Sequence, residues 1–384
     1  MAVRDELTGG SRRTTVPAGP PTMGVEEEYL LLDPTSGLPM PKVEAVREAA
    51  GLHPAVDHAE LQHELLQAQI EVATPVCSAL AEVGGHLLRL RHALAAAAED
   101  SGCRLAACAT GPYAPAAPPA ITDAPRYHSI SRQVTRLADE ALINGMHMHV
   151  GIPDQEYGVA LLNRLRPWLP ILTALAANSP VWHGSDTGFA SWRTVVFGRW
   201  PISGIPPLFA GAQDYEERIQ HLLDAQLIRD RGQLYWQARL SARFPTIELR
   251  AMDVQLRADE AVMLAGLVRA LAVTLSRERS PAPAPPAWPP EGLAGAGWHA
   301  ARHGMGAMLH DPRTGLARPA GAIVEDMIDY LTPALAEAGD TREVVPLLDR
   351  LMREGNGAER QRRSLAETGR QGLITMIAAE TSAS

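Results

Sequence analysis

The chain has 384 residues, of which 46% are hydrophobic and 21% charged, and its formal net charge is -9. This composition is typical of a globular protein long enough to bury a large core. No basic stripe marks a nucleic-acid surface, and no apolar run reaches the roughly 18–20 residues of a membrane-spanning helix. We therefore expect neither nucleic acid nor a membrane as a partner.

The three cysteines, Cys77, Cys103 and Cys108, are too few and too irregularly spaced for a disulfide or zinc framework. Each is expected to be a small buried apolar residue. Residues 1–22 mix charged residues, Gly and Pro without an apolar stretch, which excludes a secretory signal and predicts a flexible tail. A cytoplasmic location follows as an expectation.

The predicted elements begin with a strand from Gly24 to Asp33, which is closed by the turn signal Asp33-Pro34. Ser78 to Asp100 predicts a helix, with Ser78 as its cap. Further along the chain we expect a loop at 111–125, a strand at 145–152 and a helix at 155–178 interrupted near its two prolines.

The second half predicts a long ordered loop at 179–209, a helix at 215–228, a strand at 244–254 and an amphipathic helix at 258–277. A proline-rich break at 280–290 fits a linker or a surface excursion. From Trp298 the chain reads as mostly helical, with a tail at 376–384. Strands among helices without a βαβ rhythm predict an α+β fold with an antiparallel sheet. We place one catalytic domain at 23–375.

Polar side chains recur two residues apart on three predicted strands: Glu26 with Glu28, His147 with His149, and Glu248 with Arg250. Residues two apart on a strand share a face, so Glu27 points to the other side. Burying such groups costs several kcal/mol unless they are paired or bound to metal. Each pair alone also fits a solvated or salt-bridged face, whereas the three together favour one shared face.

Glu64 and Glu71 add two carboxylates. Their odd separation puts them on opposite faces of a regular strand but on one face of a helix, so either the strand holds only Glu71 or a bend intervenes. Taken alone, Glu64 equally fits a solvated surface residue. A sheet this rich in carboxylates suits Mg²⁺, which prefers oxygen ligands and is normally shared with nucleotide phosphates.

Neither a Walker-type phosphate loop nor a usable GxGxxG motif is present. If ATP binds, metal ions and arginines must therefore hold its phosphates. Forked guanidinium donors match phosphate or carboxylate, and the candidates are Arg193, Arg239, Arg243 and Arg250. Any isolated member of this set also fits a plain surface charge.

These residues resemble the glutamate–cysteine ligase type 2 family, carboxylate–amine ligases related to glutamine synthetase. No single segment is decisive, but the ordered set is specific. The matching segments, in the expected order, are Gly24–Tyr29, Gln69–Pro75, Gly145–Val150, Ala177–Pro180 with Asp186–Gly188, Tyr235–Trp236, Thr246–Arg250 and Ala301–Gly304.

The resemblance implies a curved, mainly antiparallel sheet that is lined by the active site and packed against helices. It implies metal and phosphate ligands at Glu26, Glu28, Glu71, His147 and Glu248. Arg239, Arg243 and Arg250 would bind ATP. Glu64 falls at an acidic active-site position, Arg250 would face the transferred phosphate, and Arg193 would hold a substrate carboxylate or phosphate.

The implied reaction uses ATP and Mg²⁺, with Mn²⁺ as the alternative ion, to convert a carboxylate into an acyl phosphate that an amine then attacks. The implied partners are a small-molecule carboxylate and an amine, amino acids foremost. Family members are often oligomeric, so a homo-oligomer is a further expectation.

Several positions depart from the family pattern. The segment Ala109–Pro112 lacks a His, Gln237 replaces an Asp, Asn144 replaces a Cys, and an Ala- and Pro-rich stretch at 114–120 replaces a Trp and a Gln. These changes predict an altered choice of acid or amine. Two alternatives stay open: a Zn²⁺-dependent hydrolase that uses His147, His149 and a carboxylate, and a non-catalytic nucleotide-binding member.

Overall fold

The computed structural model describes residues 19–115, 117–278 and 288–383. The described residues therefore leave out positions 1–18 of the expected N-terminal tail. They also leave out positions 280–287 of the expected proline-rich break. Residue 290 already begins a helix. Within the described ranges, no helix is both long and apolar enough to cross a membrane.

The centre of the fold is a seven-stranded sheet in the order β2-β3-β1-β5-β9-β8, with β4 also paired to β1. Every pairing within it is antiparallel. This confirms the α+β class and the antiparallel sheet. The strands are β1 (Met23–Leu32), β2 (Leu61–His63), β3 (Gln69–Ala73), β4 (Arg104–Ala106), β5 (Gly145–Gly151), β8 (Ala238–Leu240) and β9 (Thr246–Asp253).

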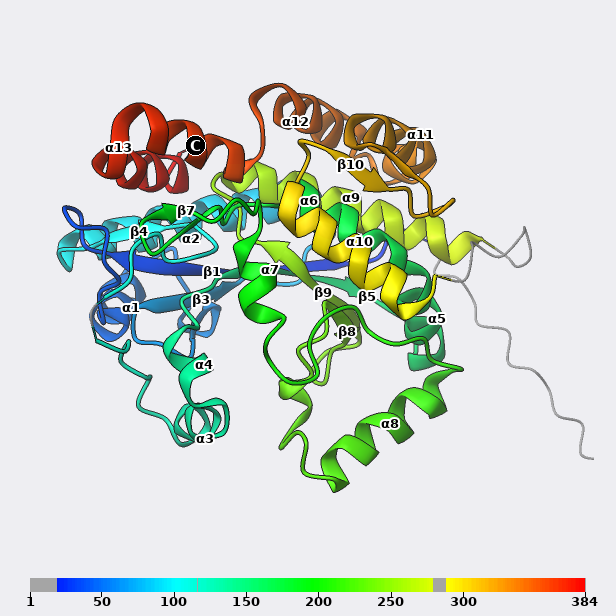
Figure 1. Ribbon diagram of the computed structural model, residues 1–384, viewed down its shortest axis with the longest axis horizontal. Coiled ribbons are helices and arrows are strands. Elements are labelled where there is room, and N and C mark those ends of the chain that lie inside the picture. The colour runs from blue at the N-terminus through cyan, green and yellow to red at the C-terminus, as the bar shows by residue number, and fades with distance from the viewer. Residues whose placement is uncertain (1–18, 116, 279–287, 384) are drawn as a thin grey trace, which may run out of the picture.

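Helices cover the sheet in layers (Figure 1). They are α1 (Val43–Gly51), α2 (Leu80–Asp100), α3 (Pro125–Val134), α4 (Arg136–Asp139), α5 (Gln155–Leu165), α6 (Leu169–Leu175), α7 (Trp192–Phe197), α8 (Ala212–Asp224), α9 (Ala258–Arg277), α10 (Pro290–His303), α11 (Ala320–Ala338), α12 (Thr341–Glu354) and α13 (Gly357–Thr381). Two short hairpins, β6 (Val181–Trp182) with β7 (Ser185–Asp186) and β10 (Met308–His310) with β11 (Ala317–Pro319), complete the fold with three short 3₁₀ turns, η1 (His58–Glu60), η2 (Arg166–Trp168) and η3 (Arg231–Gln233).

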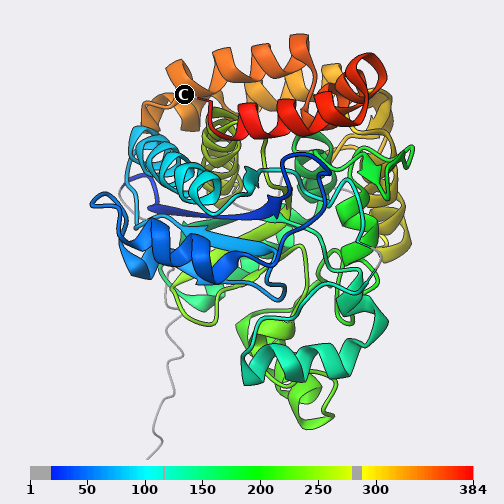
Figure 2. The same cartoon turned by 90° about the vertical axis from the view of Figure 1, so that its left-hand side faces the viewer.

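Helices α2 and α9 lie against one face of the sheet, and α11, α12 and α13 form an outer layer beyond them (Figures 1 and 2). Helix α9 is buried almost all round, so the exposed polar face expected of an amphipathic helix at 258–277 is wrong. Its polar residues Glu260 and Arg269 are themselves buried and ion-paired. The opposite face of the sheet is flanked by α3, α4 and α8 (Figure 1). This second face carries the polar pairs.

Strand β1 shows how one sequence serves both faces. Val25, Glu27 and Tyr29 alternate with Glu26 and Glu28, and the first set is fully buried against the helices. Glu27 is accordingly 0% exposed, and Arg91 of α2 neutralises it through Nε at 3.0 Å and Nη2 at 2.5 Å. Glu27 is thus a buried structural residue on the face opposite the site.

Three expected local features differ in the structure. Ser78 does not cap α2, because the carboxylate of Glu82 accepts the free N–H groups of Ser78 at 2.7 Å and Ala79 at 3.2 Å. The expected loop at 179–209 contains α7 and the β6–β7 hairpin. The expected tail from 376 continues α13 to Thr381, whose hydroxyl accepts the N–H of Ala107 at 2.8 Å.

Cys77, Cys103 and Cys108 are all free and buried, as their scarcity predicts. Burial raises the pKa of Cys103 to about 11 and that of Cys108 to about 12. Both are therefore uncharged thiols under ordinary conditions, which disfavours a nucleophilic role.

Candidate active site

Strand register brings the three polar pairs together on the face away from α2. Glu26 lies opposite His147, and Glu28 lies opposite Glu71. Across the next ladder, Glu248 lies opposite His149. Four neighbouring strands, β3, β1, β5 and β9, therefore contribute to one continuous patch of carboxylates and imidazoles.

Distances within this patch are short. Nδ1 of His147 lies 3.0 Å from a Glu26 oxygen, and its Nε2 lies 3.6 Å from Glu28. Nε2 of His149 lies 3.3 Å from the other Glu26 oxygen, and Nδ1 of His147 lies 4.0 Å from Glu248. Glu26 is thus the carboxylate shared by both histidines.

The two histidines differ in charge preference. Burial, reinforced by the charge of Arg250, lowers the pKa of His147. Burial also opposes charge on His149, but the adjacent Glu26 and the charge of Glu248 together outweigh burial and raise its pKa. For Glu26 the two neighbouring imidazoles together likewise outweigh burial and hold the pKa well below its usual range. Neutral His147 is the form able to bind a metal ion.

Glu64 and Glu71 lie in crowded negative surroundings. Glu71 lies on β3, whereas Glu64 follows β2 in the connecting segment, so the strand holds only Glu71. Burial and the charge of Glu28 raise the pKa of Glu64 to about 8. Burial and the neighbouring charges of Glu26, Glu64 and Glu28 raise the pKa of Glu71 well above its usual value. Both carboxyls would ionise readily only beside an added positive charge.

Two of the four candidate arginines bind the same carboxylate. Arg239 donates to Glu248 through Nε at 2.8 Å and Nη2 at 3.0 Å, and Arg250 donates to it through Nη1. Burial alone would raise the pKa of Glu248, but Arg250 and Arg239 hold it well below its usual range. Nη1 of Arg250 also lies 3.4 Å from His147.

The other two arginines occupy different places. Arg193, at the start of α7, is 3% exposed, and its guanidinium donates to the carbonyl of Arg250. Arg243 is exposed in the turn between β8 and β9 and makes no ion pair with a described carboxylate. The structure therefore brings Arg193, Arg239 and Arg250 to the patch but leaves Arg243 at its margin.

A bulge shapes the centre of the patch. The β5–β9 register shifts between Met146 and Met148, so that Arg250 and Ala251 of β9 face the single residue His147. The local bend puts the Arg250 side chain beside both His147 and Glu248. Bulges are common next to active sites because they re-aim a side chain in this way.

The donor set fits a hard divalent cation. Ligand atoms of Glu26, His149 and Glu248 lie within 4.8 Å of one another, the one such cluster found among the described residues. Nε2 of His147 and Nε2 of His149 are both buried and make no hydrogen bond to any residue that the structure describes. Carboxylate oxygens with one or two imidazoles are suitable ligands for Mg²⁺ or Mn²⁺.

His149 and Thr246 are two site residues that the sequence assignments left out of the metal set. The sequence places His149 on the shared polar face with His147 but assigns it as a ligand only in the hydrolase alternative. Thr246 lies two residues before Glu248, so strand alternation puts it on the same face. Its hydroxyl lies 2.9 Å from Nδ1 of His149 and leaves Nε2 facing Glu26.

The comparisons with known proteins agree over most of the chain. The family model described as "Glutamate-cysteine ligase family 2(GCS2)" matches residues 22–378. A relative from Salinispora arenicola (strain CNS-205), named "Putative glutamate--cysteine ligase 2", is 44% identical over 344 residues, covering 90% of each chain. A relative of the same name from Rhodopirellula baltica is 40% identical over 348 residues, covering 89% of this chain and 93% of its own.

Two solved structures share the fold at low sequence identity. The glutamate–cysteine ligase of Francisella tularensis, solved in complex with AMP, has a TM-score of 0.69 at 11% identity and covers 94% of this chain and 88% of its own. The bifunctional glutathione synthetase of Pasteurella multocida also has a TM-score of 0.69, at 16% identity, and covers 94% of this chain and 52% of its own. The chain therefore belongs to the glutamate–cysteine ligase family 2, and it is an ATP-dependent carboxylate–amine ligase.

Proposed function

We propose that this ligase joins an amino-acid carboxylate to an amine at the carboxylate–imidazole patch, with ATP held there by Mg²⁺ or Mn²⁺. The observation that carries this proposal is the meeting of Glu26, Glu28, Glu71 and Glu248 on one sheet face. Clustered carboxylates repel one another, and an added cation removes that repulsion. Arginines at the border of the patch supply further positive charge for phosphate.

Glu26, Glu28, Glu71, Glu248 and His147 would hold the metal ion or ions, and the geometry adds His149. The ion supplies charge neutralisation for the nucleotide phosphates and for the phosphoryl group in transfer. Glu26 contacts both histidines, so it would serve as a ligand together with either of them. One or two ions fit this arrangement.

In the first step the substrate carboxylate oxygen attacks the γ-phosphorus of ATP, which forms an acyl phosphate and releases ADP. Arg250 is placed to stabilise the transferred phosphoryl group, because Glu248 keeps its guanidinium charged. Burial opposes charge on Arg250, but Glu248 outweighs this effect and raises its pKa. Arg193 would hold the substrate carboxylate or the phosphate, since buried guanidinium donors bind oxyanions strongly.

In the second step the amine attacks the acyl carbonyl, phosphate leaves, and the nitrogen loses a proton. Glu64 would accept that proton. In the metal-free protein burial and Glu28 raise its pKa to about 8, so Glu64 would act as a base once the positive charge of a bound ion favours its ionised form. Positioning and electrostatics supply the rest, so no protein nucleophile takes part.

The second part of the proposal concerns which carboxylate and which amine the enzyme joins. The relatives' name directs the first test to glutamate and cysteine. Gln237 precedes β8, and its backbone carbonyl accepts the N–H of Arg250 at 2.7 Å, so a neutral amide stands beside that arginine. Its Oε1 is buried and bonds to no described group. A free acceptor there favours a substrate donor, and we propose a preferred pair other than glutamate and cysteine.

A Zn²⁺ hydrolase would need both histidines and one carboxylate around a single ion. Within the described ranges, the close cluster contains His149 with two carboxylates and not His147. Oxygen-rich donors favour Mg²⁺ over Zn²⁺. The ligase therefore fits the donor set better.

Two broader expectations accompany this function. We propose a cytoplasmic location, where ATP and free amino acids are available, and a homo-oligomeric assembly. Light scattering of the purified protein measures the assembly directly, and a monomer at micromolar concentration would contradict it.

The test is to incubate the protein with ATP, Mg²⁺ and matrices of carboxylates and amines while following ADP and phosphate. ADP release that requires both substrates, with an amide product in the mass spectrum, supports the proposal. Hydroxylamine in place of the amine should trap the acyl phosphate as a hydroxamate. ADP release without an amide or hydroxamate would contradict it, and glutamate with cysteine being the fastest pair would contradict the altered choice.

A further inference from the structure

Arg193 is a buried arginine with few hydrogen bonds. Its Nη1 and Nη2 donate to one carbonyl, that of Arg250, at 3.4 and 3.3 Å. Its Nε is buried and bonds to nothing in the part of the chain that the structure describes. Burial also lowers the pKa of Arg193, so keeping its guanidinium charged costs free energy. A guanidinium in this state needs other groups to keep it in place until an anion arrives.

Asp253, at the end of β9, supplies that restraint. Its carboxylate is 1% exposed and accepts three hydrogen bonds: from the backbone N–H of Asn178 at 2.8 Å, from Ser179 Oγ at 2.7 Å and from Ser191 Oγ at 2.9 Å. Ser179 Oγ in turn accepts the backbone N–H of Arg193 at 3.0 Å. One carboxylate thus fastens both ends of the segment 178–193 to the sheet.

The guanidinium itself packs on Gly145 of β5. A Cβ at position 145 would collide with Nη2 of Arg193. The N–H of Gly145 donates to Glu28 at 2.5 Å, so the same glycine contacts the carboxylate patch. Nη1 of Arg193 lies 3.9 Å from Asp253, close enough for attraction but beyond a hydrogen bond. Its donors therefore stay available to a ligand.

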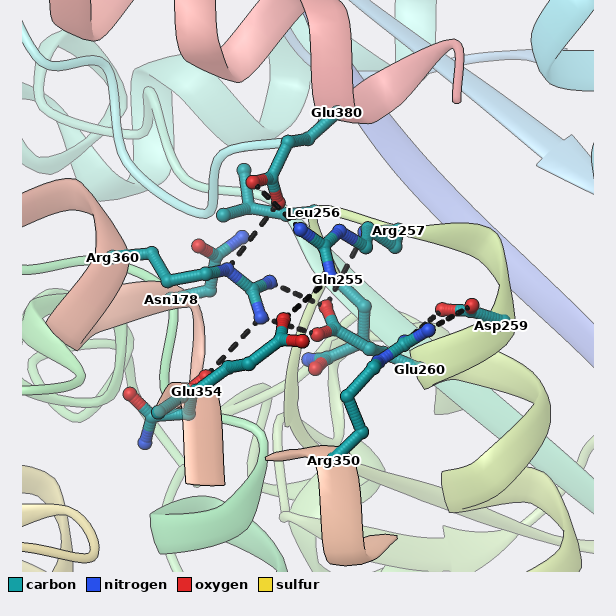
Figure 3. A network of polar contacts seen from close by, with 12 residues as sticks. Asn178, Gln255, Leu256, Arg257, Asp259, Glu260, Arg350, Glu354, Arg360 and Glu380 are labelled. Atoms are coloured by element: carbon teal, nitrogen blue, oxygen red, sulfur yellow. Dashed lines mark hydrogen bonds and ion pairs between the residues drawn. The ribbon is translucent and has the colours of Figure 1, made fainter. Parts of the chain in front are cut away.

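The C-terminal helix reaches the same segment. Nε2 of Gln361 in α13 donates to the carbonyl oxygen of Asn178 at 2.9 Å and to its Oδ1 at 2.7 Å. One residue earlier, Arg360 forms a two-pronged ion pair with Glu260 of α9, at 2.5 and 2.7 Å. Figure 3 shows Asn178, Gln255 and this ion pair side by side at the start of α9.

We propose that Asp253 is a positioning residue for Arg193 and that α13, through Gln361 and Asn178, completes this support. The inference rests on the proposed function in that Arg193 binds the substrate anion. Asp253 does not touch the reacting groups. It acts by holding the 178–193 segment so that Arg193 lies against Gly145 beside the patch.

The kinetic test is Asp253→Asn, which removes the charge and one acceptor while conserving shape. We expect kcat/KM for the carboxylate substrate to fall about 10–100-fold, as is typical of misplaced binding groups, while KM for MgATP changes less than about twofold. The control is Asp340→Asn. Asp340 is 4% exposed and pairs with Arg269 away from the site, so its loss should lower stability and leave both constants unchanged.

A second readout does not need turnover. The ¹⁵Nε–H resonance of Arg193, assigned through Arg193→Lys, should be sharp in the wild type and in Asp340→Asn. It should broaden or shift in Asp253→Asn and, to a smaller extent, in Gln361→Glu, which replaces the amide donor of Gln361. If Asp253→Asn does not fold, Ser191→Ala removes one of the three bonds to Asp253 together with the side-chain cap of α7, and Ser191→Asn, which can still cap the helix, separates the two effects.

An unchanged resonance in a folded Asp253 or Ser191 variant overturns the proposal, whatever the kinetics. A changed resonance with normal kinetics overturns the catalytic part of it. If the wild type releases no ADP with any substrate pair, the proposed function fails, and the resonance still decides whether Asp253 positions Arg193.

Discussion

Glu26 and Glu27 are adjacent in sequence, but their side chains lie on opposite faces of β1. Glu26 contacts both site histidines, whereas Glu27 is buried against Arg91. Identical substitutions at the two positions therefore separate chemistry from folding.

Glu26→Gln is expected to lower the rate of ADP formation by at least about 100-fold, because a metal-binding charge at the phosphates is lost. The variant should still fold cooperatively, since the side chain is partly exposed and borders other carboxylates, but the loss of its contacts with His147 and His149 lowers the free energy of unfolding. Initial rates and urea unfolding measure the two effects. An active Glu26→Gln variant would remove this residue from the metal set.

Glu27→Gln is the matched control with the opposite outcome. It leaves the Arg91 guanidinium buried without a counter-charge, which typically costs about 3–5 kcal/mol. Arg91 keeps its bonds to the carbonyls of Gln255 and Leu256, so the chain should still fold. At a temperature where the variant is folded, its ADP formation should be close to that of the wild type. A loss equal to that of Glu26→Gln would contradict the two-face assignment.

Glu71 gives a prediction about pH. In the metal-free folded protein Glu64 and Glu71 keep protons that the unfolded chain has already released, so the folded state binds more protons. The contribution of these two carboxyls to the free energy of unfolding therefore falls as pH rises from about 5 to about 8. The raised pKa of His149 acts in the same sense and the lowered pKa of His147 in the opposite sense. Glu26 and Glu248 have lowered pKa values and act in the opposite sense, but their effect is complete below this window.

Urea midpoints in EDTA at the two ends of that window test this trend. Glu71→Gln should be more stable than the wild type at the upper end and should show a flatter profile. Saturating Mg²⁺ should flatten the wild-type profile as well. A wild-type midpoint that rises with pH in EDTA would show that these two carboxyls are not the dominant groups.

At the scale of elements, α12 and α13 are both held to α9 by ion pairs between residues that are far apart in sequence. Arg360 pairs with Glu260, Arg257 pairs with Glu354 and Glu380, and Arg350 pairs with Asp259, all around the first turn of α9 (Figure 3). Acidic residues in that first turn also suit the positive end of the helix dipole.

Arg360→Met is expected to destabilise the protein by about 3–5 kcal/mol, because Glu260 is 1% exposed and would lose its partner. The double variant Glu260→Met/Arg360→Met should recover most of this loss, since replacing both charges with apolar groups of similar size is often neutral. Urea unfolding of the two variants measures it. Equal stability of the single variant and the wild type would mean that this pair adds nothing.

Strand alternation predicted the polar pairs correctly because side-chain direction on a strand is a local rule. It could not predict which pairs meet. That depends on strand order and register, such as Glu26 facing His147 rather than His149, which long-range packing decides. The bulge that places Arg250 between His147 and Glu248 has no signal in the sequence around it.

Other differences have similar causes. Ser78 is a good capping residue in general, but Glu82 reaches the same N–H groups with a full charge. The segment after 376 looks like a polar tail, yet Ile377 and Thr381 are buried there because α13 packs beside β4. Contacts of this kind join distant parts of the chain and are invisible to a local pattern.

At the scale of the whole molecule, strands from both halves of the chain contribute to the carboxylate patch. Repulsion between these carboxylates therefore lowers the stability of the whole sheet. Each of β3, β1, β5 and β9 presents a carboxylate or an imidazole there. A ligand that neutralises the patch therefore crosslinks the sheet, and it should stabilise the molecule as a unit.

Mg²⁺ together with a non-hydrolysable ATP analogue is expected to raise Tm by about 3 °C. A ligand at about 100 times its Kd contributes about 2.7 kcal/mol. Each kcal/mol moves Tm by only about 1 °C in a chain of 384 residues, because the entropy of unfolding grows with chain length. Either ligand alone should give a smaller shift, because the phosphates and the carboxylates repel one another without the ion.

Differential scanning calorimetry measures these shifts. The Asp340→Asn variant should start from a lower Tm but show the same increase in Tm with both ligands. Glu248→Gln should lose most of it, since that carboxylate joins the patch to Arg239 and Arg250. A full shift from the analogue in EDTA would mean that the nucleotide binds without the ion, against the role assigned to the four carboxylates.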